Sequence, residues 1–486
     1  MLDAYAPDRV RAAESRLMEQ LPEGELMGRA AAGLAEVCRA RLAERGGTSV
    51  VALVGPGNNG GDALYAVAHL AEEGLDCVVL QGDWDAHPGG LAAATAAGVR
   101  VLRGDAEGQA AALAGADLVV DGVLGIGGRP GLPGEAVTWV DAIPESAFVV
   151  AVDLPSGQDP AGEHASDQGV FADETVTFGV AKPVHLLPAT ELAVGRLTVV
   201  DIGLTFERAG DVQRLGHDDV ALLWPRPGAT DDKYSRGVLG VVAGSEDYTG
   251  AAVLCCTAAV GAGLGMLRYV GPPTPVSLVR AAVPEAVIGV GRVQAWVVGP
   301  GIDATSDTDT ARAQLDAGRE ALASDLPVLV DAGGLDLVDG SRKAPTLLTP
   351  HAGELARLLS RLTGTEVTRA QVSITPLAHA RRAADLTGAT ILLKGSTTLV
   401  VPPTSADLPV RSQNDAPPWL ATAGAGDVLA GLCGALLAAG LSPLDAGSLG
   451  ALVHGVAADR ANPGGPLRAL AVAHGIPTTV AHLLTR

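Results

Sequence analysis

The sequence is poor in aromatic residues, in lysine and in positive charge. Phe, Trp and Tyr make up 3% of its 486 residues, whereas hydrophobic residues make up 48%. Much of the hydrophobic share is alanine, so we expect cores built by close packing of small side chains. The net charge is 34 − 55 = −21, which argues against a surface for nucleic acid or for an anionic membrane. Backbone amides and a few local cations would have to hold any phosphorylated ligand.

The sequence also lacks the cysteine spacing of a zinc site or a disulfide framework. No C-x-x-C occurs among its five cysteines, Cys38, Cys77, Cys255, Cys256 and Cys433. This pattern is typical of the reducing cytosol, and no signal peptide is visible, so we expect a cytoplasmic protein. Residues 248–267 and 428–444 carry no charge but are rich in Ala and Gly, which predicts buried helices rather than membrane spans.

The length predicts two domains of roughly 200–250 residues each. Strands and helices alternate in both halves, which predicts α/β domains with parallel sheets. Residues 206–236 are polar and turn-rich and interrupt the alternation. We therefore expect domains at 1–210 and 231–486, with a linker at 211–230. The predicted strands are 49–54, 76–81, 99–103, 117–121, 148–153, 174–179 and 197–203, then 237–245, 295–301, 327–334, 346–351 and 389–395.

Three polar or glycine-rich loops follow strong strands of the first half. They are GPGNNGGD at 55–62, GVLGIGGRPG at 122–131 and LPSG at 154–157, the last preceded by Asp153. Ligands of open α/β sheets bind outside the carboxyl ends of the strands, so these loops should meet at one edge. Their glycines would let backbone N–H groups point at phosphate oxygens.

The first loop contains G-x-G-x-x-G, which leaves three interpretations open. It is a plain tight turn, the NAD site of a dehydrogenase, or a phosphate loop for other chemistry. A dehydrogenase would need an acidic residue at the end of the next strand, where only Asp83 stands. Asn58, Asn59 and Asp62 place side-chain oxygens in the loop, which a simple pyrophosphate turn does not require.

These oxygens suggest a bound cation. Asn59, Asp121 and Ser156 stand on three different converging loops, and each offers a hard oxygen donor. A monovalent ion would tie the loops together. A hydrogen-bond network without metal is the alternative.

Lysine is rare enough for each one to be informative. Only four of the 34 basic residues are lysines, namely Lys182, Lys233, Lys343 and Lys394. Lys182 follows the strand at 174–179 and would reach Asp153 at the same sheet edge. An Asp/Lys pair can move protons at an acid- or base-labile carbon, although a plain salt bridge is the alternative.

The second half contains a second anion-binding turn. In ATAGAGDVLAG, at 421–431, a small-residue turn opens a helical run and Asp427 stands at its start. A carboxylate beside a phosphate site can accept a proton from an attacking hydroxyl, whereas a helix N-cap is the alternative. Lys394 and its hydroxyl neighbours follow one strand, and His351 and Glu354 follow another. By the strand-end rule His351 should lie at the same sheet edge, where it could contact a ligand, and capping or packing is its alternative role. No G-x-x-x-x-G-K-[ST] motif is present, so the site is not of the Walker type.

The first half resembles a known family. VALVGPGNNGGDALYAVAHL, VDGVLGIGGRPG, VAVDLPSG and TVTFGVAKP are similar to the YjeF-type epimerase domain of the bifunctional NAD(P)H-hydrate repair enzymes, over about residues 10–210. The resemblance implies a Rossmann-like domain that interconverts R- and S-NAD(P)H hydrate and binds K⁺ through Asn59, Asp121 and Ser156. It implies catalysis by Asp153 with Lys182. The hydrate would contact Asn58, Asn59, Gly60, Gly61, Asp62, Gly125, Ile126, Gly127, Gly128, Arg129, Pro130, Gly131 and Asp153. Ile126 and Ala63 depart from the usual pattern, where the family has a hydroxyl residue and a glycine.

The second half resembles the ribokinase-like ADP- or ATP-dependent NAD(P)H-hydrate dehydratase over roughly 225–485. Besides GAGD, the opening DDKYSRGVLGVVAGSEDYTGAAVL carries this similarity, whereas RSQNDAPPWLAT is less typical. The resemblance implies Asp427 as the base, Mg²⁺ with the nucleotide, and ADP as the expected donor. Hydrate contacts would be Ala252, Gly301, His351 and Asp427. Nucleotide contacts would be Lys394, Gly395, Ser396, Thr397, Thr398 and Gly426.

Both halves in one chain favour a bifunctional repair enzyme acting on NADH and NADPH hydrates, and we expect a homo-oligomer. The alternative is a ribokinase-like vitamin or sugar kinase fused to a non-catalytic dinucleotide-binding or scaffold domain.

Overall fold

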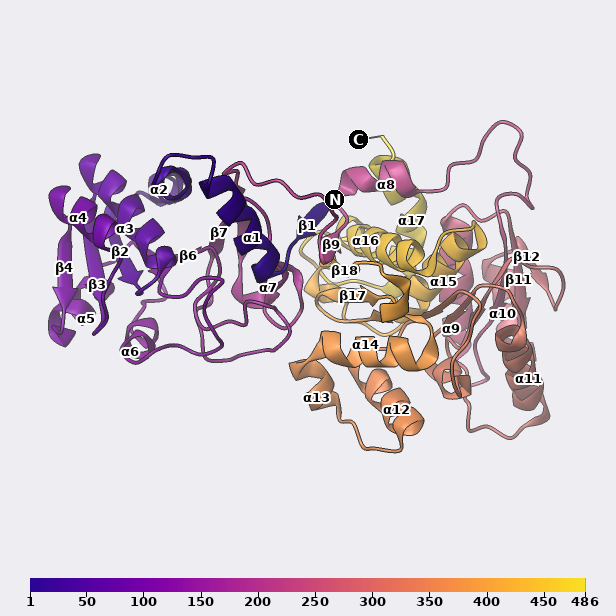
Figure 1. The fold of residues 1–486 in the computed structure, drawn as a ribbon. Coiled ribbons are helices and arrows are strands. Elements are labelled where there is room, and N and C mark those ends of the chain that lie inside the picture. Colours follow the sequence, from indigo (N-terminus) through magenta and orange to yellow (C-terminus); the bar gives the residue numbers. More distant parts are fainter. Residues whose placement is uncertain (486) are drawn as a thin grey trace. The chain divides into compact units, whose positions relative to one another are not determined.

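The computed structural model describes residues 1–485. The chain divides into two compact units, one of residues 3–212 and one of residues 1–2 together with the chain from 213 onward. Figure 1 labels the elements of both units. The segment predicted as a linker, 211–230, is partly regular structure, because it contains β9 (Val212–Arg214) and α8 (His217–Leu223). Its apolar side chains, among them Val220 and Trp224, belong to the core of the second unit.

The first unit is built on a seven-stranded parallel sheet, which confirms the predicted Rossmann-like fold. All seven strands predicted for this half are present. In order across the sheet they are β4 (Arg100–Arg103), β3 (Asp76–Gln81), β2 (Ser49–Val54), β5 (Leu118–Gly122), β6 (Phe148–Val152), β7 (Glu174–Phe178) and β8 (Arg196–Val200).

Helices cover both faces of this sheet, which explains why its strands read as nearly continuous apolar runs. In β2, Val50, Ala52 and Val54 pack on one face with α2, α3 and α4, whereas Val51 and Leu53 pack on the other with α5 and α6. The helices are α1 (Pro7–Met18), α2 (Glu25–Arg45), α3 (Asn58–Glu72), α4 (Pro88–Ala96), α5 (Ala106–Ala114), α6 (Ala136–Asp141) and α7 (Pro183–Leu186).

The strand order locates the binding edge of this unit. From β2, the chain proceeds outward through β3 and β4 and then returns to place β5 on the other side of β2. The strand order therefore reverses between β2 and β5. In sheets of this kind a crevice opens at that point, outside the carboxyl ends of the strands.

The second unit contains a sheet of eleven strands. The strands between β12 and β16 pair in parallel, and β17 and β18 add an antiparallel extension. In sheet order they are β1 (Leu2–Ala4), β9, β18 (Val410–Gln413), β17 (Thr398–Val401), β16 (Thr390–Leu393), β15 (Thr346–Leu348), β14 (Val328–Val330), β13 (Ala295–Val298), β10 (Val238–Val242), β11 (Met266–Val270) and β12 (Ala286–Ile288).

Two groups of helices accompany this sheet (Figure 1). One group, packed around α15, contains α9 (Thr249–Gly261), α15 (Ala425–Ala438), α16 (Pro443–Ala461) and α17 (Ala469–Leu483). Besides α8, the other helices of this unit are α10 (Pro273–Ala282), α11 (Asp309–Ala323), α12 (Ala352–Thr363), α13 (Arg369–Ile374) and α14 (Pro376–Thr387). This arrangement agrees with the predicted ribokinase-like α/β class.

The two uncharged runs form α9 and α15, which pack directly against each other. No helix within residues 1–485 is long and apolar enough to cross a membrane. Contact between these helices depends on glycine, because a Cβ atom on Gly431 would lie 2.1 Å from the carbonyl oxygen of Cys255. All five cysteines are buried and unpaired.

Gly431→Ala is expected to destabilise the second unit by about 1–3 kcal/mol, because the added methyl group must separate α9 from α15. Gly250→Ala is the matched control, because a Cβ there meets no atom within 4 Å. Scanning calorimetry should show a lower melting temperature for the first variant and an unchanged or higher one for the second. Equal melting temperatures would contradict the packing described here.

Candidate active sites

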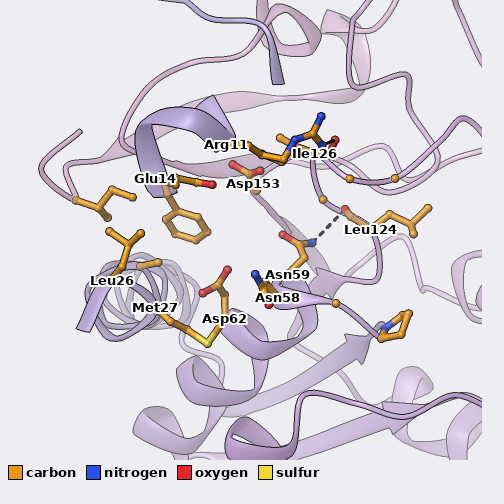
Figure 2. Close-up of a pocket in the computed structure, with 18 of the residues that line it drawn as sticks. Arg11, Glu14, Leu26, Met27, Asn58, Asn59, Asp62, Leu124, Ile126 and Asp153 are labelled. Carbon is orange, nitrogen blue, oxygen red and sulfur yellow. Dashed lines mark hydrogen bonds between the residues drawn. The ribbon is translucent and has the colours of Figure 1, made fainter. Parts of the chain in front are cut away.

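A cavity of about 440 Å³ opens in the first unit. Residues following β2, β5 and β6 line it, as the strand order predicts, and α1 and α2 contribute further walls (Figure 2). Eight of the predicted hydrate contacts line this cavity: Asn58, Asn59, Asp62, Gly125, Ile126, Gly127, Gly128 and Asp153. The three loops therefore meet at one edge.

The other predicted hydrate contacts of this unit lie behind or beside the cavity wall. Gly60 is needed for packing, because a Cβ atom there would lie 2.2 Å from the carbonyl oxygen of Gly55. Gly131 links two loops, since its N–H donates to the carbonyl oxygen of Gly157 at 2.9 Å. Gly61, Arg129 and Pro130 are likewise absent from the lining. Asp83, the acidic residue that a dehydrogenase site would use, is exposed and pairs with Arg103 at 3.2 Å.

The three predicted cation ligands belong to one hydrogen-bond network around Leu124. The amide of Asn59 donates to the Leu124 carbonyl at 3.0 Å, and the Leu124 N–H donates to Ser156 Oγ at 2.8 Å. Ser156 donates to Asp121 through its hydroxyl at 2.6 Å and its N–H at 2.8 Å. Burial raises the pKa of Asp121 to about 6, opposed only by these and one further hydrogen bond. Within residues 1–485, no cationic side chain pairs with this carboxylate.

Asp153 and Lys182 form a buried ion pair, as their positions after neighbouring strands predict. Lys182 Nζ lies 2.6 Å from Asp153 Oδ1 and also donates to Thr177 Oγ1 at 2.7 Å and to the Phe178 carbonyl at 3.0 Å. The ammonium therefore has all three protons engaged, and Lys182 does not line the cavity. Burial alone would raise the pKa of Asp153, but the attraction of Lys182 outweighs it and lowers the pKa. The lysine keeps Asp153 ionised.

Two further carboxyl groups, those of Asp62 and Glu14, face Asp153 across the cavity (Figure 2). Burial raises the pKa of Asp62 well above its usual value, and the charges of Asp153 and Glu14 raise it further. Burial also raises the pKa of Glu14, with Lys182 acting in the opposite direction. Sequence reasoning missed Glu14. It stands on α1, a helix with many charged residues, and only the position of that helix over the cavity identifies it.

The second unit contains a similar ion pair. Lys394 Nζ lies 2.7 Å from Asp331 Oδ1 and 3.8 Å from Glu354 Oε2, and Thr349 Oγ1 donates to Asp331 at 2.9 Å. Burial opposes the charge of Lys394, but Asp331 and Glu354 outweigh it and raise the pKa of the ammonium. Sequence reasoning missed Asp331, although it directly follows β14. The predicted strand 327–334 extended past it, so the strand-end rule did not select it.

Asp427 lies beside this pair at the start of α15. Gly424 caps the helix in the left-handed conformation, with φ 89° and no side-chain cap, so Asp427 is not the N-cap that was its alternative role. The glycine at 426 lets the turn approach the Lys394 ammonium closely, because a Cβ atom there would lie 3.3 Å from Lys394 Nζ. Burial, reinforced by the charge of Asp331 and opposed by that of Lys394, raises the pKa of Asp427 to about 7.

His351 has the capping role that the sequence left open. Its Nδ1 accepts the N–H groups of Gly353 and Glu354 at 3.0 and 3.2 Å, which caps α12. Its backbone also bridges to Lys394, next to β15 and β16. The imidazole remains half exposed, and its Nε2 lies 3.5 Å from Glu354. A ligand contact is therefore compatible with capping.

The remaining predicted contacts of this unit divide into two groups. Ala252 is fully buried and packs against the turn at Gly244, and Gly301 packs against the start of α9, where a Cβ atom would lie 2.6 Å from Ala251. Their contribution would be to shape the backbone. The segment between β16 and β17 joins the two strands beside Lys394. Within it Gly395 and Ser396 are exposed, Thr397 is buried, and Thr398 begins β17.

Comparison with known proteins agrees with this division of the chain. Residues 23–184 match the family described as YjeF-related protein N-terminus, and residues 239–469 match NAD(P)H-hydrate dehydratase. A bifunctional NAD(P)H-hydrate repair enzyme of Mycobacterium tuberculosis is 46% identical over 456 residues, which cover 90% of this chain and 89% of that protein. The chain belongs to the family of bifunctional NAD(P)H-hydrate repair enzymes.

Other relatives extend over most of the chain. The repair enzyme of Mycobacterium leprae is 44% identical, covering 95% of this chain and 94% of that one. Among solved structures, the ADP/ATP-dependent NAD(P)H-hydrate dehydratase of Bacillus subtilis, co-crystallized with ATP/Mg²⁺, is 25% identical with a TM-score of 0.48. It covers 56% of this chain and 99% of its own. The two family models and the relatives that match both halves show that the chain is an enzyme with one YjeF-type and one dehydratase-type domain.

Proposed function

We propose that the first unit interconverts the R and S epimers of NADH and NADPH hydrates, and that the second unit dehydrates the S epimer with consumption of ADP or ATP. One observation carries the proposal. Each unit places an acidic group beside a glycine-rich turn and next to a buried lysine–aspartate pair. Such turns bind phosphates, and such acidic groups move protons. The family of the chain supports the same assignment.

For epimer exchange, the carbon that carries the added hydroxyl must lose and regain it. Asp62 in its neutral form would protonate the hydroxyl, and the C–O bond would break with help from the ring nitrogen's electron pair, releasing water. Water would then add to the other face and transfer a proton to ionised Asp153. Two carboxyl groups whose environments separate their pKa values suit these roles, and those of Asp62 and Asp153 shift in opposite directions.

The residues around Leu124 suit a potassium ion. Asp121 is fully buried and has no basic partner within residues 1–485. The Ser156 hydroxyl donates to it, and the Asn59 side chain joins the same network through its amide nitrogen. Hard oxygen donors are the ligands that such a cation prefers. The ion would neutralise Asp121 and join the loops that follow β2, β5 and β6.

In the second unit, the hydrate's hydroxyl would attack the terminal phosphorus of the nucleotide. The new O–P bond forms as the bridging P–O bond breaks, and Asp427 accepts the hydroxyl proton. The C–O bond then breaks and expels phosphate, a better leaving group than hydroxide. Loss of a proton from the neighbouring carbon restores the nicotinamide ring. Lys394 would contact the nucleotide phosphates.

Magnesium would accompany the nucleotide. The described residues hold no set of three acidic, histidine or cysteine side chains arranged for a metal ion. The ion would therefore rest mainly on the nucleotide's phosphates, with Asp331 or Glu354 as a carboxylate ligand, as is common for Mg²⁺. When bound, the ion neutralises charge on the phosphates. Cytoplasmic location, homo-oligomerisation and the choice of ADP over ATP stay predictions.

The two activities should be separable by single substitutions. Asp153→Asn is expected to abolish epimer exchange and leave S-hydrate dehydration unchanged, because the two carboxylates serve different reactions. Asp427→Asn should lower nucleotide-dependent dehydration by at least about 100-fold and leave epimer exchange unchanged. Chromatographic separation of the epimers, together with recovery of NADH absorbance, measures both. If the unaltered protein instead accumulates a stable phosphorylated alcohol from a vitamin or sugar, the kinase alternative holds.

Potassium should stabilise the first unit through Asp121. At ten times its Kd, the ion would add about 1.4 kcal/mol to the free energy of unfolding. Calorimetry in KCl and in tetramethylammonium chloride at equal ionic strength measures this difference. Asp121→Asn should remove it, whereas Asp76→Asn, at an exposed residue, should retain it. A potassium effect that survives Asp121→Asn would exclude this site.

Dehydration should depend on pH through Asp427. A base with a pKa of about 7 is protonated below that pH, so kcat/KM for the S hydrate should fall about tenfold per pH unit below 7 and level off above it. The measurement uses saturating nucleotide, with affinity checked at each pH and uncatalysed hydrate decay subtracted. A flat profile between pH 5.5 and 8 would contradict the assignment of Asp427.

A further inference from the structure

Asp153 has an unusual backbone conformation for a residue whose side chain must be held in place. Its φ angle is 65°, in the left-handed region, which costs a non-glycine residue about 1–2 kcal/mol. Its N–H donates to the Val176 carbonyl at 2.8 Å, so β7 holds the chain on the amino side. The carbonyl side of Asp153 needs a second support, because strained conformations persist only where surrounding contacts fix them.

His185 supplies that support. Its Nε2 lies 2.7 Å from the Asp153 carbonyl oxygen, and its Nδ1 lies 2.9 Å from the Lys182 backbone nitrogen. A backbone N–H can only donate, so Nδ1 must accept. Nε2 then carries the proton and donates to Asp153. The contacts therefore determine the tautomer, and burial, reinforced by Lys182, lowers the pKa of the imidazole to about 4, which keeps it neutral.

The same imidazole completes the cap of α7. Lys182 is the N-cap residue and His185 is the third helical residue, where a Glu or Gln usually accepts the N-cap N–H. A glutamate would accept this bond but has no proton for the Asp153 carbonyl, and it would add a second negative charge beside the ion pair. Histidine supplies one acceptor and one donor without charge.

We infer that His185 is a positioning residue for epimer exchange, joining the backbones of Lys182 and Asp153 so that their side chains stay paired and the carboxylate faces the cavity. His185 is buried and does not line the cavity, so it acts through Asp153 rather than on the substrate. This inference rests on the proposed role of Asp153 as proton acceptor. Neither the family resemblance nor the glycine-rich loops pointed to His185.

Substitutions at His185 can separate positioning from general stability. His185→Ala should lower kcat for epimer exchange about 10–100-fold with KM nearly unchanged, since misplacement of a catalytic group by about 1 Å has effects of this size. His185→Gln retains an acceptor and a donor and should restore most of the rate, whereas His185→Glu should not. The unfolding transition of the first unit, recorded by calorimetry for each full-length variant, checks that this unit is folded. His69→Ala, at an exposed histidine of α3, is the matched control and should behave as the unaltered protein.

A spectroscopic measurement tests the tautomer independently of activity. Long-range ¹H–¹⁵N NMR of the imidazoles should show one histidine with protonated Nε2 and unprotonated Nδ1 at neutral pH, and His185→Gln should remove that signal. A protonated Nδ1 at His185, an unchanged kcat in His185→Ala, or equal losses in the Gln and Glu variants would each overturn the inference. If Asp153→Asn stays active, the proposed role of Asp153 fails. If only His185→Ala stays active, the positioning inference alone fails.

Discussion

A buried ion pair between a lysine and an aspartate at the end of a parallel strand is the interaction on which each active site depends. Lys182 pairs with Asp153 at 2.6 Å and Lys394 with Asp331 at 2.7 Å. In each unit a threonine hydroxyl donates to the same aspartate oxygen at 2.9 Å. Removing either partner would leave a buried charge without compensation, which costs about 3–5 kcal/mol. The chain otherwise prefers arginine, and a compact ammonium fits these enclosed positions where a planar guanidinium would not.

Each pair sets the charge of the acidic groups around it, with different results in the two units. In the first unit Lys182 holds Asp153 ionised. Burial raises the pKa values of Asp62 and Glu14, and repulsion by the Asp153 carboxylate raises them further. In the second unit the pair leaves Asp427 with a pKa of about 7, close to the working range of a general base. In the proposed reactions, the same arrangement would provide an acid beside a base in one domain and a base beside a phosphate-binding turn in the other.

Sequence reasoning predicted the parallel sheet of the first unit and most central strands of the second, because buried strands with apolar runs and glycine-rich ends are distinctive. It did not predict β1, β11, β12, β17 and β18, which lack an independent signal in the sequence. It assigned β9 and α8 to a linker because their polar residues masked a few core side chains. The strand-end rule placed Asp153 and Lys182 together. The rule could not find Glu14 or His185. The position of α1, which carries Glu14, and the tautomer of His185 both depend on contacts between segments distant in the sequence. Asp331 was missed because the predicted strand 327–334 extended past the true end of β14 at Val330.

The most direct test of the account is an epimer-resolved hydrate assay of Lys182→Met and Lys394→Met, with melting temperatures recorded for both. Lys182→Met should lose epimer exchange while retaining nucleotide-dependent dehydration of the S epimer, and Lys394→Met should show the opposite pattern. Full activity of either variant in its own reaction would contradict the dependence of the sites on these buried pairs.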